Sequence, residues 1–242
     1  MSEQKLFVEK YQLVIPGDKL ATGRFKPGLG VFRERKKTDE YVYYSALIGL
    51  ANVRGNTIHV IPLEGSYVPL EDDVIIGKIS TVGGRSWMVD IKGPYPAVLS
   101  LSSVLDQNSR PNSNVDLSKY LQRGDLILAK ITAFDRTRDP LITMNFRGGK
   151  KLVSGRMIEV NPVKVPRIIG KQGSMINLLQ RLTKSNLFTG QNGRILINSP
   201  NFETEQIVIE AIMKITRESH ISGLTDRIKL FLQEKIENLA KE

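Results

Sequence analysis

Apolar and polar residues alternate in short runs from residue 1 to about residue 69, and turn signals separate these runs. Residues 53–60 form one pair of runs around Gly55-Asn56, a dipeptide typical of a two-residue hairpin turn. Alternation with a period of two is typical of strands that bury one face. The pattern therefore predicts a small β-rich domain over residues 1–69, with a hairpin at residues 53–60.

The same alternation continues, with longer apolar runs, to residue 147. A polar loop at residues 106–118 interrupts it, and such a loop between strands is typical of a small closed barrel of the oligonucleotide-binding (OB) type. We expect the barrel to span residues 70–149 and to present one outer face to a ligand, because side chains along a strand point alternately inward and outward. Its five predicted strands are residues 74–82, 86–91, 95–101, 125–135 and 141–146.

After Gly148-Gly149 the apolar period changes from two to about 3.6, which is typical of helices. Leu224, Ile228 and Leu232, with Leu239 beyond them, predict an amphipathic helix at the end of the chain. The fold class is therefore multidomain β and α+β, with a last domain over residues 150–242. The other elements predicted in that domain are a strand at 157–160, a helix at 174–182, a hairpin at 187–189 and 194–198, and a long helix at 203–219 that starts after Ser199-Pro200.

Composition narrows the chemistry that the chain can perform. The 242 residues include no cysteine and two distant histidines, which excludes disulfides, thiolate zinc sites, cysteine nucleophiles and an imidazole-rich metal cluster. Any metal would need oxygen ligands, and no metal or other cofactor is expected. No apolar run approaches the roughly 20 residues of a membrane span, and the first ten residues lack the features of a signal peptide. We therefore expect a cytoplasmic protein.

The chain is strongly basic. Its net charge is +10 and its pI about 9.7, which favours a polyanionic partner, although a merely solvated basic surface is the alternative. Residues 151–242 carry 14 basic and 9 acidic side chains, the largest basic excess of the three predicted domains. Contacts to phosphate are therefore expected first in the last domain.

The segment IIGKQGSMI, residues 168–176, carries the strongest functional signal. Two glycines three positions apart allow a sharp turn and a close approach to a sugar-phosphate chain. Lys171 adds positive charge at the tip, and a helix beginning near Ser174 points free backbone N–H groups to the same place. The residues expected to contact RNA here are Arg167, Gly170, Lys171, Gln172, Gly173 and Ser174.

The same glycine spacing recurs at residues 190–193, where Asn192-Gly193 between two strand-like runs predicts a hairpin turn instead. The first copy follows a strand and lies between helical runs. Its string, together with the strand, helix, helix, strand, strand, helix order of residues 153–219, resembles the type I KH domains, which bind RNA. A plain connection between two helices is the alternative.

Residues 72–147 resemble an S1 domain, an RNA-binding barrel, through residues 76–79, 88–91, 99–102 and 124–135. S1 domains usually stack bases on aromatic residues and a histidine, whereas Arg85, Met88 and Ser100 occupy those positions here. Trp87 beside them is open to two interpretations, base stacking or partly buried packing. Basic side chains would instead give sequence-tolerant phosphate contacts, with a solvated barrel rim as the alternative. The candidate residues of this S1 face are Arg85, Trp87, Lys130, Arg136 and Arg138.

The domain order resembles that of the KH-containing cap subunits of the archaeal RNA exosome, supported by residues 65–69 and 73–77 at the first junction. The absence of cysteine argues against the sister cap, which carries a zinc ribbon. The resemblance implies a non-catalytic subunit, three of which, alone or mixed with the zinc-ribbon cap, sit on a hexameric ring of phosphorolytic subunits. Its N-terminal domain would dock on the ring, and the cap would capture single-stranded RNA, favour A-rich tails and raise degradation efficiency.

Two other classes of function stay open. One is a free-standing S1/KH RNA chaperone or ribosome-associated factor, which would bind RNA without a ring. The other is a ribonuclease that uses its own carboxylates and a divalent metal. Its candidates are Asp72-Asp73 and the Asp135/Asp139 pair, but adjacent residues on an extended chain point to opposite faces, and the second pair is flanked by arginines.

Overall fold

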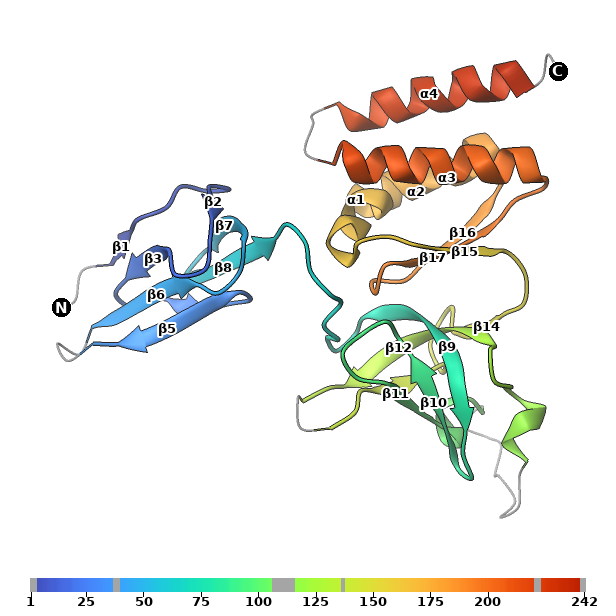
Figure 1. The fold of residues 1–242 in the computed structure, drawn as a ribbon, viewed down its shortest axis with the longest axis horizontal. Helices are drawn as coiled ribbons and strands as arrows, with labels where there is room; N and C mark the ends of the chain where they lie inside the picture. The colour runs from blue at the N-terminus through green and yellow to red at the C-terminus, as the bar shows by residue number, and fades with distance from the viewer. Residues whose placement is uncertain (1–3, 37–39, 106–115, 136–137, 220–222, 240–242) are drawn as a thin grey trace. The chain divides into compact units, whose positions relative to one another are not determined.

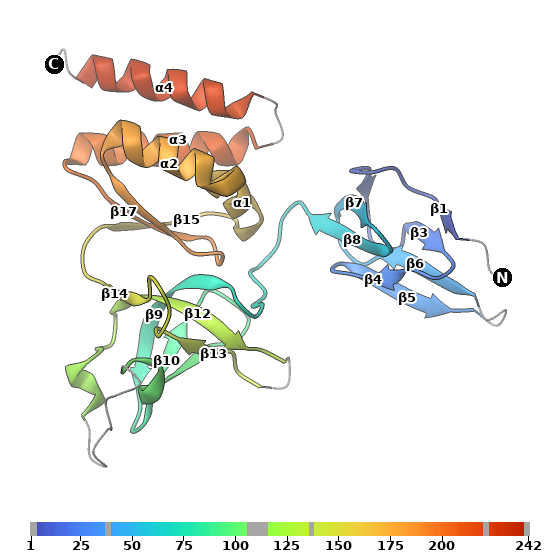
Figure 2. The ribbon, with the colours of Figure 1, turned by 180° about the vertical axis from the view of Figure 1, so that it is seen from behind.

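A computed structural model describes residues 4–36, 40–105, 116–135, 138–219 and 223–239. Contacts divide the chain into two compact units, Met1–Gly65 and Ser66–Glu242. Figures 1 and 2 show the ribbon from opposite sides. None of the helices described is both long and apolar enough to cross a membrane.

The first unit is all β, as predicted. Its strands form two four-stranded sheets, in the orders β1-β3-β6-β5 and β2-β7-β8-β4, around a core that includes Leu20, Tyr43 and Val60. The predicted hairpin is confirmed, because β7 and β8 pair on either side of Gly55-Asn56. The strands are β1 (Lys5–Leu6), β2 (Leu13–Val14), β3 (Lys19–Thr22), β4 (Lys26–Pro27), β5 (Val31–Arg35), β6 (Tyr41–Ser45), β7 (Gly49–Arg54) and β8 (Thr57–Pro62).

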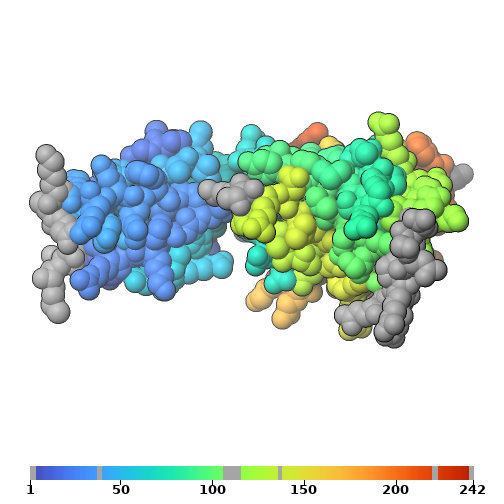
Figure 3. Space-filling view, turned by 90° about the horizontal axis from the view of Figure 1, so that it is seen from below, coloured from blue at the N-terminus to red at the C-terminus, as the bar shows by residue number. Residues whose placement is uncertain are grey.

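The second unit begins with the predicted five-stranded barrel, which closes because β13 pairs with both β11 and β12. Its surface, coloured from cyan to yellow, is seen from the barrel side in Figure 3. A sixth strand, β14, extends the sheet beside β12 and was not predicted. The strands are β9 (Val74–Val82), β10 (Ser86–Asp90), β11 (Ala97–Ser100), β12 (Leu126–Ala133), β13 (Leu141–Thr143) and β14 (Lys150–Leu152), with short 3-10 turns η1 (Leu101–Ser103) and η2 (Leu117–Lys119).

The rest of the unit has the predicted KH order. Strands β15 (Arg156–Glu159), β16 (Asn186–Thr189) and β17 (Arg194–Asn198) form an antiparallel sheet in the order β15-β17-β16. Three helices lie against one face of this sheet: α1 (Val165–Ile169), α2 (Ser174–Thr183) and α3 (Phe202–Arg217), with 3-10 turns η3 (Pro162–Lys164) and η4 (Lys171–Gly173) beside α1 and α2. Helix α3 starts after Ser199-Pro200, as predicted, and Asn201 caps it, since its side chain accepts a hydrogen bond from the N–H of Thr204 at 2.8 Å.

Strand β17 is buried on both faces. Ile195 and Ile197 pack under the helices, whereas Leu196 points the other way, into a cluster with Ile76 and Leu128 on the outside of the barrel. Alternation along the strand thus joins the KH region to the barrel.

One helix lies outside the KH order. Helix α4 (Leu224–Leu239) buries the predicted stripe of Leu224, Ile228 and Leu232 against the KH helices. Ion pairs from Lys235 to Glu210 at 2.9 Å and from Arg227 to Glu218 at 3.1 Å hold it on α3. Both ribbon views show α4 as an outer layer over α2 and α3 (Figures 1 and 2).

Candidate nucleic-acid interface

The loop at residues 170–173 has the backbone that its glycines predict. Helix α1 ends at Ile169, and Gly170 turns the chain with φ 75° and ψ 173°. Gln172 (φ 52°) and Gly173 (φ 77°) are both left-handed, and α2 starts directly after them at Ser174. Three positive φ values in four residues make this loop a sharp turn between two helices.

The two glycines are required for different reasons. A Cβ on Gly170 would lie 2.7 Å from the backbone nitrogen of Met175, so a side chain there would push into the first turn of α2. The atom nearest to a Cβ on Gly173 would be the side-chain nitrogen of Asn177, at 3.4 Å, which is ordinary contact. Only the positive φ therefore disfavours another residue at this position. Gly173 therefore tolerates substitution better than Gly170.

The loop projects from a buried base. Ile168 and Met175 on either side are buried, whereas Lys171, Gln172 and the first residue of α2, Ser174, are accessible at the surface. No side chain caps the N-terminus of α2. The Ser174 N–H donates to the backbone oxygen of Lys171, so the later N–H groups of this turn and the Lys171 ammonium are the groups that can meet a phosphate. Arg167, on the last turn of α1, is also exposed.

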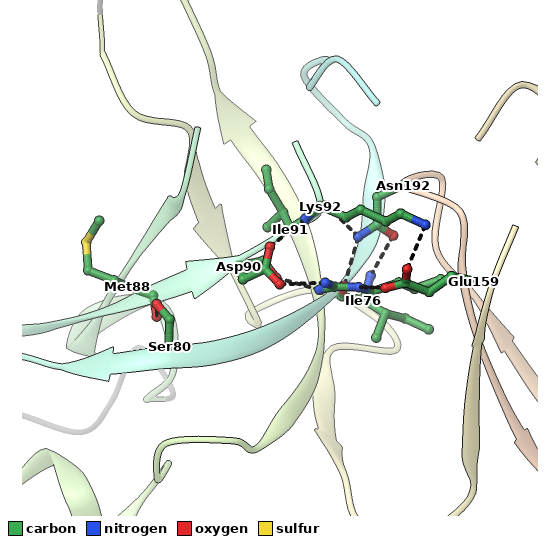
Figure 4. A network of polar contacts seen from close by, with 9 residues as sticks. Ile76, Ser80, Met88, Asp90, Ile91, Lys92, Glu159 and Asn192 are labelled. Carbon is green, nitrogen blue, oxygen red and sulfur yellow. Dashed lines mark hydrogen bonds and ion pairs between the residues drawn. The ribbon is translucent and has the colours of Figure 1, made fainter. Parts of the chain in front are cut away.

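The second glycine turn, residues 190–193, is buried against the barrel. Asn192 is fully buried, and its side-chain amide donates to the backbone oxygens of Ile76 and Ile91 at 2.9 and 2.8 Å. Its Oδ1 accepts from the N–H of Ile76 at 3.3 Å, and Figure 4 shows these contacts. A Cβ on Gly190 would lie 2.6 Å from that same nitrogen. The predicted hairpin turn is confirmed, and it also fixes the KH region to the barrel.

Arg194, directly after this turn, continues the attachment. It is 4% exposed, and its guanidinium donates to the carboxylate of Asp90 at 2.5 Å and to Glu159 at 3.3 Å. Lys92 adds an ion pair to Glu159 at 2.8 Å. Partial burial disfavours the charged form of Asp90, but the hydrogen bond from Arg194 keeps its pKa below the ordinary value. Hydrogen bonds from Lys92 and then Arg194 likewise lower the pKa of Glu159.

We call this contact the KH–barrel joint, and sequence reasoning missed it. Its members come from four separated segments of the chain, and the single local signal is the unbroken apolar run of residues 195–197, which is typical of a strand covered on both faces. Asn192 and Arg194 bond to the backbone of Ile76, and Asn192 also bonds to that of Ile91. The polar residues of the joint are Asn192, Arg194, Glu159, Asp90 and Lys92.

The structure decides between the two interpretations of Trp87 in favour of packing, and it covers part of the barrel's outer face. Trp87 is fully buried and its indole N–H donates to the backbone oxygen of Leu121 at 3.0 Å, so the ring belongs to the barrel core and offers no face to a base. The outer face expected to be open is covered where Ile76 and Leu128 pack with Leu196 of the KH sheet. The apolar residues on this part of the face pack against the KH sheet and are not accessible to a ligand.

The basic residues of the S1 face differ in accessibility. Arg85 is exposed between β9 and β10, and the Arg138 side chain is 84% exposed, with Asp135 at 3.9 Å. Lys130 is held by Asp72 at 2.6 Å, so its ammonium is already partnered. Arg136 lies outside the described residues. Phosphate contacts by these residues stay a prediction.

Three of the four carboxylates considered for metal catalysis, Asp72, Asp73 and Asp135, have other partners. The Asp73 carboxylate accepts from the Tyr67 hydroxyl at 2.8 Å, and burial, despite that bond, raises the pKa of Asp73. Asp72 forms an ion pair with Lys130. Within the described ranges, no three histidine, aspartate or glutamate side chains gather where they could hold a metal ion.

Comparison with protein families gives two matches along the chain. Residues 11–64 match the model of the N-terminal domain of the exosome RNA-binding protein RRP4, and residues 66–133 match that of the RRP4 S1 domain. The two matches follow the two parts of the fold that precede the KH region.

Known proteins are similar over nearly the whole chain. The exosome complex component Rrp4 of Pyrococcus furiosus is 45% identical over 239 residues, which cover 98% of this chain and 88% of that protein. Rrp4 of Saccharolobus solfataricus is 41% identical, with 96% and 92% coverage. A crystal structure of a protein described as a putative exosome complex RNA-binding protein superposes with a TM-score of 0.64 at 42% identity, over 72% of this chain and 98% of that one.

Proposed function

The chain belongs to the Rrp4 family of archaeal exosome components, and we propose that it is a non-catalytic, RNA-binding cap subunit acting in the cytoplasm. It captures single-stranded RNA, preferring A-rich tails, and feeds 3′ ends into a hexameric ring of phosphorolytic subunits. Three copies, alone or mixed with the zinc-ribbon cap, form the cap and raise both RNA binding and degradation.

One observation carries the RNA-binding part of this proposal. Lys171 and Gln172 stand exposed at the tip of a glycine loop whose base is buried, beside the uncapped N-terminus of α2. Such a loop accepts a sugar-phosphate backbone and makes few demands on base identity. This suits an RNA-degrading machine, which must take many sequences and let the strand move.

The surface of the first unit supports docking on a ring. Half of the large apolar side chains found exposed in the described residues lie in this unit, although it is only about a quarter of the chain. Ile15 and Ile48 flank the paired strands β2 and β7, so apolar side chains gather at one sheet edge. Exposed apolar groups of this kind favour a protein partner. The nine residues are Leu6, Phe7, Tyr11, Leu13, Ile15, Leu29, Phe32, Leu47 and Ile48.

The test is a reconstitution with the full chain, labelled A-rich RNA, magnesium and phosphate. The chain alone is expected to retain RNA without shortening it, and to accelerate degradation when the phosphorolytic ring is added. Shortening by the chain alone would favour the ribonuclease alternative. RNA binding with no effect on the ring, and no co-purification with ring subunits from native extract, would favour the free-standing RNA-binding factor.

A further inference from the structure

A groove of about 340 Å³ runs between α2 and the extra helix α4. Ser174, Asn177 and Arg181 line it from α2, and Thr225 and Lys229 line it from α4. The spacing of three or four residues on each helix places these side chains in two facing stripes. Ser174 also follows the glycine loop directly, so the groove opens beside the proposed RNA contact.

The lining of the groove is basic and hydrogen-bonding. Arg181 and Lys229 are both exposed, and neither forms an ion pair with any residue that the structure describes. None of the described residues that line the groove is acidic, and Ser174, Asn177 and Thr225 supply hydroxyl and amide groups. Two cations without a carboxylate partner favour an anion, and the polar groups can bond to ribose hydroxyls.

Other surface grooves of the second unit differ in charge. The groove on the barrel combines Lys78 and Arg123 with Asp90. The two grooves along α3 and α4 contain Glu234 beside Lys235, and Glu210 and Glu218 beside basic residues. In each of them a carboxylate neutralises part of the positive charge. Of these four grooves, all formed by described residues, the α2–α4 groove, defined by residues 174, 177, 178, 181, 225 and 229, is the one without a lining carboxylate, so it suits a phosphate chain.

We propose that the α2–α4 groove is a second RNA-backbone site, which extends the path of a strand beyond the glycine loop. This rests on the proposed RNA capture by the loop. The strand passes from Lys171 over Ser174 and along the groove, where Arg181 and Lys229 contact successive phosphates. Helix α4, which is not part of the KH order, thus lengthens the RNA footprint of the domain.

The footprint predicts an effect that depends on RNA length. A KH loop holds about four nucleotides, so a four-nucleotide RNA should bind without the groove, whereas an RNA of roughly twelve nucleotides should reach it. Arg181→Glu and Lys229→Glu are each expected to weaken binding of the longer RNA by roughly threefold to tenfold. The slope of log affinity against log salt concentration should become shallower by about 0.7 for each phosphate that is no longer bound. Binding of the short RNA should stay nearly unchanged.

The full chain offers a matched control for Arg181→Glu. Arg217 is also an exposed arginine in the last turn of its helix, but it lies on α3, outside the α2–α4 groove. Arg217→Glu makes the same charge change and should bind both RNAs like the wild type. Circular dichroism should show all these variants folded, because the substituted side chains are exposed.

Three outcomes decide the proposal. Selective loss of long-RNA binding in the Arg181 and Lys229 variants supports it. If those variants bind the long RNA like the wild type, or if Arg217→Glu loses as much binding as they do, the groove proposal is overturned. The proposed role of the loop still stands in that case if Lys171→Asp weakens the binding of both RNAs. If Lys171→Asp with Gln172→Asp weakens neither RNA, the proposed RNA capture by the loop fails as well, and the groove has no path to extend.

Discussion

Two turns of this protein share the spacing Gly-x-x-Gly, yet they serve opposite purposes. Residues 170–173 lift Lys171 and Gln172 into solvent, whereas residues 190–193 bury Asn192 against the backbone of the barrel. In the first turn the residues between the glycines are free for a ligand. In the second turn, the polar groups of the Asn192 side chain already form hydrogen bonds within the protein.

Glycine spacing alone therefore does not identify a binding loop. Gly170 is required by the start of the next helix, and Gly190 by the closeness of Ile76 in another domain. What decides the function is whether the turn joins two helices and stays exposed beside the start of the second, or joins two strands and docks on a neighbouring sheet. Each turn can therefore be disabled separately.

The largest effect is expected from breaking the buried turn. Asn192→Ala removes three hydrogen bonds and leaves groups of Ile76 and Ile91 unpaired. Because each buried group without a partner costs about 1–3 kcal/mol, the free energy of unfolding should fall by roughly 2–4 kcal/mol. Urea denaturation followed by the fluorescence of Trp87, the one tryptophan, measures this in the barrel core.

Gln191→Ala is the control within the same turn. Gln191 is exposed and its side chain makes one hydrogen bond, to the N–H of Val74 at 2.6 Å, so the loss should stay below about 1.5 kcal/mol. Both variants should bind RNA like the wild type wherever they are folded. Equal destabilisation by the two substitutions would contradict the role given to Asn192.

The next effect concerns the exposed turn. Lys171→Asp with Gln172→Asp keeps both glycines but reverses the charge at the tip, so affinity for single-stranded RNA should fall about tenfold or more, equal to a loss of at least about 1.4 kcal/mol. Stability should barely change, because both side chains are exposed and aspartate tolerates the left-handed backbone of Gln172. Fluorescence anisotropy with labelled RNA provides the measurement.

Lys184→Asp is the matched control for the exposed turn. Lys184 is exposed and left-handed as well, but it lies at the other end of α2. Its replacement should leave the affinity for a short RNA close to that of the wild type. Replacing Gly170 by aspartate would be a poorer test, since the new Cβ would lie 2.7 Å from the nitrogen of Met175 and disturb the helix.

A smaller effect is expected on the barrel. Arg85→Gln or Arg138→Gln should lower RNA affinity about twofold to threefold. The slope of log affinity against log salt concentration should become shallower by about 0.7 for each phosphate that the variant no longer binds. Lys130→Gln removes the same charge from a side chain already held by Asp72 and should change the salt dependence less. A salt series of binding measurements distinguishes these variants. Identical slopes in all of them would remove the S1 face from the RNA path.

The smallest effect concerns pH. Because the pKa of Asp90 is lowered in the folded chain, its contribution to stability is complete above its ordinary pKa and is lost as the pH falls through the folded value. The Tm of the wild type should therefore exceed that of Asp90→Asn above about pH 5, and the two should converge below about pH 3. If the Tm difference between the wild type and Asp90→Asn grew as the pH fell, the stabilising role given to Asp90 in the KH–barrel joint would be contradicted.

Local patterns sufficed for most elements of the fold. Alternation placed the five barrel strands, and the change to a helical period placed α2, α3 and α4, since these signals come from neighbours within one element. The glycine loop was likewise predicted from residues 168–176 alone. Strand β14 was missed because two lysines and one leucine carry no alternating pattern of their own.

The KH–barrel joint could not be predicted in the same way. Arg194 and Asp90 are 104 positions apart, and each appears in the sequence as an ordinary solvated charge. Trp87 was ambiguous for a related reason, because only the closed barrel shows which face of β10 is inside. Long-range pairing, rather than local propensity, decides both cases.

Hydrogen exchange of the full chain, with and without single-stranded RNA, tests the central contrast most directly. RNA is expected to slow exchange most at Lys171 and Gln172, because Gly170, Gly173 and Ser174 already donate backbone hydrogen bonds inside the protein. Residues 190–193 should not change, since Gly190, Gln191 and Gly193 also donate such bonds and this turn contacts no RNA. RNA-dependent protection at residues 190–193, with none at residues 170–174, would contradict this contrast.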